Sequence, residues 1–123
     1  MKIPGPDHPI TVSPAPQRVR VHFNGHVVAD SSRALVLQEA NYPPVFYIPS
    51  ADAEMALYQR TDHASHCPYK GDAGYYGLVV DGRRAENAVW VYEQPYPAVE
   101  AIRGRLAFYP NRVDRIETLP LGE

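Results

Sequence analysis

Proline limits what this chain can fold into, because 13 of its 123 residues are prolines spread along the sequence. Proline has no backbone N–H and interrupts helices, which argues against a helical bundle. Two dipeptides, Asn24-Gly25 and Asp81-Gly82, tolerate the positive φ angles of tight hairpins and are flanked by β-branched and aromatic runs. The sequence therefore predicts a mainly β fold: a small antiparallel barrel or sandwich with one or two short helical turns.

The predicted elements follow from runs of alternating or β-branched residues between turn signals. The expected strands are residues 18–23, 26–30, 45–49, 75–80, 84–93, 106–110 and 113–117. Residues 31–40 fit a helix or a strand, and a strand is favoured because prolines follow at once. Ser50 is predicted to cap one helical turn and residues 98–102 to form another. Ala88, Trp90 and Tyr92 are expected on one strand face.

The chain is predicted to form one compact domain, since 123 residues can bury a core without disulfides. Residues 1–17 contain five prolines and are predicted to be a proline-rich N-terminal arm, with the single β domain at 18–123. The separation rests on proline density alone.

Charge and cysteine content exclude several partners and compartments. The formal net charge of -2 offers no strong field for a nucleic acid polymer. Cys67 is the single cysteine, so no internal disulfide can form, which indicates a cytoplasmic protein. No apolar run approaches the roughly 20 residues that span a bilayer, and the N-terminal residues lack a signal-peptide core. We therefore expect no membrane association.

Residues 61–76, T-D-H-A-S-H-C-P-Y-K-G-D-A-G-Y-Y, hold most of the reactive side chains of the chain and are expected to form a loop beside the strand of Trp90. His63, His66 and Cys67 have the chemistry of transition-metal ligands. A structural zinc site needs four ligands, however, and this set is incomplete, so no metal site is predicted. The cofactor, if there is one, stays undetermined.

Three other hypotheses concern the same window. Cys67 is a candidate nucleophile, with His63 and His66 as proton donors or acceptors, although a lone cysteine is more often an inert apolar residue. Thr61, Lys70 and Gly71 are candidates for holding an anion, although Lys-Gly is also ordinary turn chemistry. Aromatic residues can line a pocket and offer hydroxyl groups to a ligand. The aromatic residues that could line it are Tyr69, Tyr75, Tyr76, Trp90, Tyr92, Tyr96 and Tyr109, and of these Tyr75, Tyr76, Trp90 and Tyr92 are assigned to the ligand site.

Three stretches of the chain resemble the domain-of-unknown-function family 427. They are S-S-R-A-L-V-L-Q-E-A-N-Y-P-P-V-F-Y-I-P, the window at residues 61–76, and E-N-A-V-W-V-Y-E-Q-P-Y-P-A-V with the later L-A-F-Y-P-N-R-V-D. The likeness runs from about Arg18 onward. Positions that match the family's characteristic residues are Arg33, Tyr42, Pro43, Tyr47, Thr61, His63, His66, Cys67, Pro68, Lys70, Gly71, Trp90, Tyr92 and Tyr109.

The resemblance implies a small, mainly antiparallel β domain of bacterial and fungal type, with a nucleotidyltransferase-type label but no known reaction. Nucleotidyl transfer generally needs Mg²⁺ held by acidic residues, and Asp62 and Asp72 are the two acids of the window.

The leading hypothesis from the sequence is a small ligand, with an anion among the candidates, bound in a pocket built by residues 61–76 and the strand of Trp90. Two alternatives stay open: a Mg²⁺-dependent nucleotidyltransferase-type enzyme, and a non-catalytic protein-interaction module. The oligomeric state is left undetermined.

Overall fold

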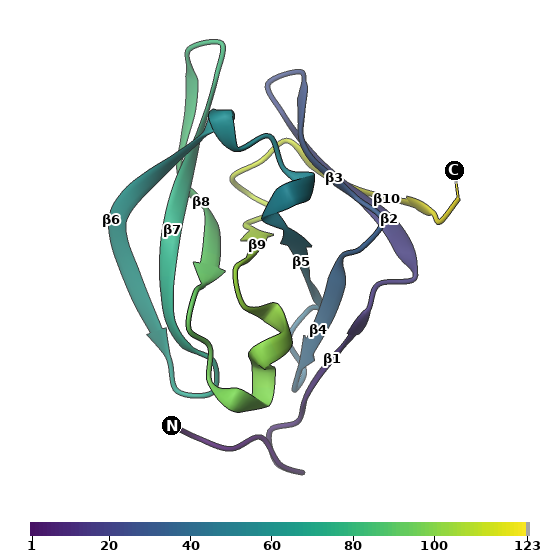
Figure 1. Cartoon of the computed structure of the whole chain (residues 1–123), viewed down its shortest axis with the longest axis vertical. Coiled ribbons are helices and arrows are strands. Elements are labelled where there is room, and N and C mark those ends of the chain that lie inside the picture. The colour runs from purple at the N-terminus through teal and green to yellow at the C-terminus, as the bar shows by residue number, and fades with distance from the viewer. Residues whose placement is uncertain (123) are drawn as a thin grey trace.

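The computed structural model describes residues 1–122 and shows a sandwich of two antiparallel sheets (Figure 1). The larger sheet has seven strands in the order β1-β4-β5-β9-β8-β7-β6, and the smaller has the order β10-β2-β3. The sandwich alternative of the predicted fold class is therefore confirmed, and the sheets do not close into a barrel. None of the helices within residues 1–122 is long and apolar enough to cross a membrane.

The larger sheet contains β1 (Ile10–Pro14), β4 (Leu35–Glu39), β5 (Val45–Pro49), β6 (Tyr58–Cys67), β7 (Gly71–Val80), β8 (Arg83–Tyr92) and β9 (Arg105–Phe108). The smaller sheet contains β2 (Gln17–Phe23), β3 (His26–Ser31) and β10 (Arg115–Pro120). Three short 3₁₀ helices complete the described chain: η1 (Ser50–Asp52), η2 (Met55–Leu57) and η3 (Pro97–Ile102).

Both predicted hairpin turns are confirmed. Asn24 and Gly25 join β2 to β3 with φ angles of 50° and 80°, and Asp81 and Gly82 join β7 to β8 with 49° and 81°. Two consecutive residues at positive φ match the twist of the flanking strands. Both turns lie at the same end of the molecule, whereas the turn between β6 and β7 and the N-terminal segment lie at the other end (Figure 1).

The predicted loop at 61–76 is wrong: these residues form most of the hairpin of β6 and β7, with a turn only at residues 68–70. The polar composition that suggested a loop has another cause. β6 is an edge strand of the larger sheet and is largely exposed, and polar side chains at an edge discourage pairing with other chains.

Three smaller expectations also need correction. Residues 10–14 of the predicted arm form β1, which pairs with β4, because Ile10 and Val12 alternate with polar residues and Pro14 occupies a position at the sheet edge. Ser50 begins η1 but does not cap it, since Pro49 occupies the cap position. Ala88 was expected on the same strand face as Trp90, but it packs with Val89 in one hydrophobic cluster while Trp90 packs against another. The positive φ of Asn87, 51°, breaks the alternation of β8 at this point.

The larger sheet buries side chains on both faces, because successive side chains along a strand point to opposite faces of the sheet. One face packs against the smaller sheet, with Val19, Val21, Ile48, Leu78, Val89 and Leu106 in the shared core. The other face carries a second cluster of Leu37, Tyr47, Ala73, Tyr75, Tyr92, Val99, Ile102 and Ala107. Within residues 1–122, η3 packs against this second face through Val99 and Ile102.

Candidate functional site

Tyrosine and tryptophan side chains from β5, β7 and β8, and from the residue after β9, converge on the second face of the larger sheet. Strand pairing places Tyr75 opposite Trp90 and Trp90 opposite Ala107, so these residues share one row of the sheet. Tyr47 enters from β5, and its ring contacts that of Trp90 edge-on at a centroid distance of 6.4 Å. The register of β5, β9, β8 and β7 thus builds an aromatic wall from distant parts of the sequence.

A cavity of about 280 Å³ lies against this wall, and we call it the tyrosine cavity. Its lining residues are Leu37, Glu39, Tyr42, Pro43, Val45, Tyr47, Ser65, His66, Cys67, Lys70, Tyr75, Trp90, Tyr92 and Tyr109. A second space of about 920 Å³, the apolar cavity, adjoins it. The residues that line both are Glu39, Tyr42, Pro43, Val45, His66, Cys67 and Trp90.

Lys70 and Glu39 form an ion pair at one end of the tyrosine cavity. The side chains of the pair are 11% and 14% exposed, so water screens the charges poorly. The other oxygen of Glu39, Oε2, lies 2.7 Å from Nε2 of His8. Burial raises the pKa of Glu39, but the hydrogen bonds from Lys70 and His8 outweigh it, and the pKa lies below its ordinary value of 4.5.

This lowered pKa predicts an acid-dependent loss of stability. A carboxyl whose pKa is lower when folded stabilises the fold above its unfolded pKa and loses that contribution as the pH falls through the folded value. We therefore expect the stability difference between wild type and Glu39→Gln to be largest near neutral pH and to shrink below about pH 4. Urea denaturation of both proteins between pH 7 and pH 3 measures it. A difference that is constant with pH would contradict the assignment.

Hydroxyl groups of three other lining residues form a short chain. Ser65 Oγ lies 2.8 Å from the Tyr75 hydroxyl, which lies 3.2 Å from the Tyr109 hydroxyl. Nearby, the indole Nε1 of Trp90 donates to the Tyr47 hydroxyl at 3.3 Å. Burial raises the pKa of Tyr47 and raises that of Tyr109 to about 12, so both phenols keep their protons at neutral pH.

Six of the ten residues predicted from the sequence as site residues line the tyrosine cavity: His66, Cys67, Lys70, Tyr75, Trp90 and Tyr92. His66 lies at the rim, where its Nδ1 is 2.7 Å from Asp72, and its side chain is 56% exposed. Cys67 is half-buried and is a free thiol. A thiol, a lysine and several phenols therefore line one cavity that is partly open to solvent.

The other four predicted residues lie elsewhere. Thr61 and His63 line a separate space of about 300 Å³ beside a bulge in β6, although the His63 ring also contacts that of Tyr75 at 4.4 Å. Tyr76 projects from the opposite face to Tyr75 and packs under the guanidinium of Arg60. Gly71 packs against backbone atoms of residues 94–96.

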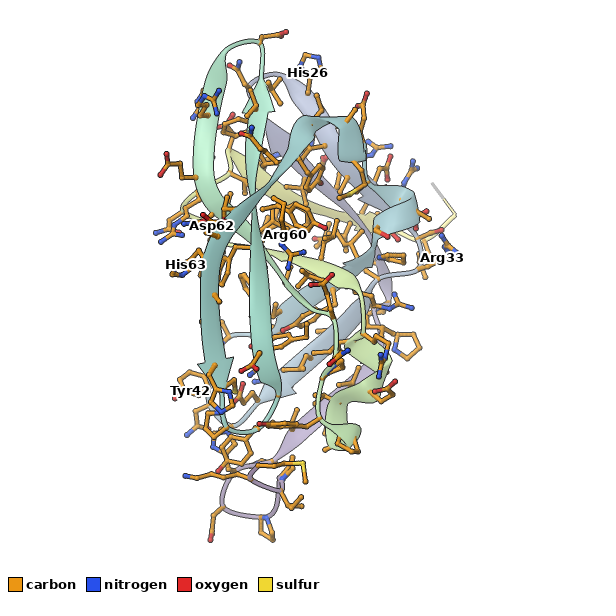
Figure 2. The ribbon with its side chains drawn as sticks, turned by 60° about the vertical axis from the view of Figure 1, so that its left-hand side comes forward. His26, Arg33, Tyr42, Arg60, Asp62 and His63 are labelled. Carbon is orange, nitrogen blue, oxygen red and sulfur yellow. The ribbon has the colours of Figure 1, made fainter. Side chains whose placement is uncertain are left out.

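Asp62 and His63 lie part-way along β6 at the outer edge, whereas Tyr42 lies near the β6–β7 turn (Figure 2). Asp62 lines the space beside the bulge, and Asp72 pairs with His66. Within residues 1–122, no group of three or more His, Cys, Asp or Glu side chains is arranged to hold a metal ion. The two acids that the nucleotidyltransferase hypothesis needs therefore belong to different surroundings.

Sequence reasoning missed Glu39, which lines the tyrosine cavity, and His8, which contacts Glu39. Glu39 ends a strand that reads as ordinary, and His8 lies in the predicted arm. Glu39 contacts Lys70 and His8, each 31 positions away in the sequence. The His8 ring also stacks on the Tyr69 ring at a centroid distance of 4.0 Å. No local pattern signals such contacts. The resemblance had already marked Tyr47 and Tyr109 as characteristic positions.

Comparison with models of protein families identifies a family for this chain. The sequence model named NTP_transf_9, described as a domain of unknown function (DUF427), matches residues 11–118. The matched range includes β1 and therefore begins earlier than the resemblance seen from about Arg18. A search of curated proteins found no match to the chain.

Proposed function

The chain belongs to the domain-of-unknown-function family 427, and we propose that it binds a small molecule in the tyrosine cavity. The observation that carries this proposal is the convergence of hydroxyl, thiol and indole groups from β5, β6, β7, β8 and the residue after β9 on one cavity. Binding sites in proteins are typically concave, mainly apolar and supplied with a few placed polar groups.

The adjoining apolar cavity supports a ligand with an apolar part. Its lining from the core includes Val45, Phe46, Ile48, Phe108 and Ile116. A molecule that reached from one space into the other would place its apolar body there and its polar group beside the tyrosines. The buried area would then supply most of the binding free energy.

An anionic ligand receives less support than the sequence suggested. Lys70 is the cation of this cavity, and it is only 9% exposed and already paired with Glu39. An anion would have to compete with that carboxylate at short range. Displacing a partner from a buried pair leaves the displaced charge uncompensated, which is costly.

Trp90 provides a direct test, because it is the only tryptophan of the chain and lines the cavity. Its indole N–H gives a single signal in a ¹H–¹⁵N correlation spectrum. We expect members of a library of small aromatic and alicyclic fragments to shift this signal. Carboxamidomethylation of Cys67 with iodoacetamide places a bulky group in the same cavity, and we expect it to weaken fragment binding at least about tenfold.

The matched control is Cys67→Ala treated with the same reagent, which should keep the affinity of the untreated variant. Equal fragment binding before and after alkylation of wild type would contradict the proposed location. A library that leaves the Trp90 signal unmoved would contradict small-molecule binding and would favour the protein-interaction alternative.

A further inference from the structure

We propose that the ligand of the tyrosine cavity is an uncharged molecule with an apolar body and a carbonyl-type hydrogen-bond acceptor, which receives a hydrogen bond from the Tyr92 hydroxyl. The inference rests on the proposed function and names its ligand class. It follows from one unpaired donor, from the protonation of the phenols and from a cavity whose charges are already paired.

The Tyr92 side chain is the unpaired donor. Tyr92 is 6% exposed and lines the cavity, yet its hydroxyl has no hydrogen-bond partner within residues 1–122. Every fully buried side-chain nitrogen or oxygen of the described residues has a partner. The Tyr92 hydroxyl therefore faces the cavity, where a ligand or a water molecule can accept a hydrogen bond from it.

Tyr92 and Tyr47 both act as donors at neutral pH. Burial raises the pKa of Tyr92, and the neighbouring Tyr47 and Cys67 raise it further. Tyr47 already accepts a hydrogen bond from Trp90, so its own proton is free for a second acceptor. Two phenol donors that line one cavity suit a ligand atom with two lone pairs, as a carbonyl oxygen has.

The charges of the cavity argue against an ionic ligand of either sign. Glu39 uses one oxygen for Lys70 and the other for His8. A cation would have to displace Lys70 from this carboxylate, and an anion would have to displace Glu39 from Lys70. Since desolvating an ion is costly without a matched partner, the arrangement selects against charged ligands.

Four probes of similar size and different polarity test the inference: acetophenone, ethylbenzene, benzoate and benzylamine. Each is titrated into ¹⁵N-labelled protein at pH 7, and the Kd is taken from the Trp90 indole signal. We expect acetophenone to bind about threefold to tenfold more tightly than ethylbenzene, the range that one net hydrogen bond supplies. Benzoate and benzylamine are expected to bind more weakly than acetophenone.

Tyr92→Phe should remove the preference by raising the Kd of acetophenone about threefold to tenfold while changing that of ethylbenzene less than about twofold. Tyr96→Phe is the matched control. Tyr96 is a half-buried tyrosine whose ring contacts the His66 ring at 6.2 Å, and it is not among the lining residues of the cavity. It should leave every Kd unchanged.

The outcomes separate the two proposals. Equal affinity for acetophenone and ethylbenzene, a tighter Kd for either ion, or an acetophenone Kd unaffected by Tyr92→Phe would overturn the ligand class but not the binding function. If neither the four probes nor the fragment library shifts the Trp90 signal, the proposed function fails, and the ligand class fails with it. If Tyr92→Phe does not fold, the Kd values of the four probes on wild type still test the proposed ligand class.

Discussion

Replacing Glu39 with glutamine is expected to lower the free energy of unfolding by about 3 kcal/mol at pH 7, measured by urea denaturation. The substitution keeps the size of the side chain and removes its charge. Lys70, which is 9% exposed, would then carry a charge without a counter-ion in the interior. Breaking a buried pair from one side costs more than the pair contributes, because the remaining charge stays desolvated.

Asp72→Asn is the matched control for this prediction. It also converts a carboxylate that contacts a basic side chain, His66, into an amide, but the Asp72 side chain is 86% exposed. Exposed pairs contribute at most about 1 kcal/mol, so we expect only a small effect. Adding Lys70→Met to Glu39→Gln should recover much of the loss, since no charge remains buried. Equal effects of Glu39→Gln and Asp72→Asn would show that burial of the pair is unimportant.

Replacing Gly71 with alanine is expected to destabilise the fold by about 2 kcal/mol. Any residue with a side chain is strained by about 1–3 kcal/mol in the backbone conformation of Gly71. Gly71 has a φ of 109°, which side chains strongly disfavour. An added Cβ would lie 3.4 Å from the carbonyl oxygen of Gln94 and 3.7 Å from Cα of Pro95, which are ordinary van der Waals distances, so the cost comes from the backbone conformation. Thermal or urea denaturation measures the loss.

Two other glycines test whether the positive φ causes that loss of stability. Gly82 has a φ of 81° but open space where a Cβ would go, and Gly5 has open space without a positive φ. We expect Gly82→Ala to cost about 1 kcal/mol and Gly5→Ala to cost nothing measurable. If Gly71→Ala matched Gly5→Ala in stability and instead weakened fragment binding, then the glycine would serve a ligand, as the sequence hypothesis held.

Much of the fold was predictable because local signals agreed with one another. Asn24-Gly25 and Asp81-Gly82 form turns wherever the flanking residues can pair, the alternation in β2 matches a pleated strand, and β5 and β8 contain runs of β-branched and aromatic residues. β6 was not predictable as a strand, because an exposed edge strand has no apolar face to reveal it. The bulge that displaces Thr61 and His63 likewise depends on pairing with β7.

The sequence by itself determined the mainly β class, the two hairpin turns and the family. These follow from short-range chemistry: proline, positive φ and alternation act between neighbours. Only the tertiary structure decided that Glu39 and His8 join Lys70, that Tyr75 faces the cavity while Tyr76 does not, and that the Tyr92 hydroxyl lacks a partner. Those facts depend on strand order and register, which bring together residues about 30 or more positions apart without a local signal.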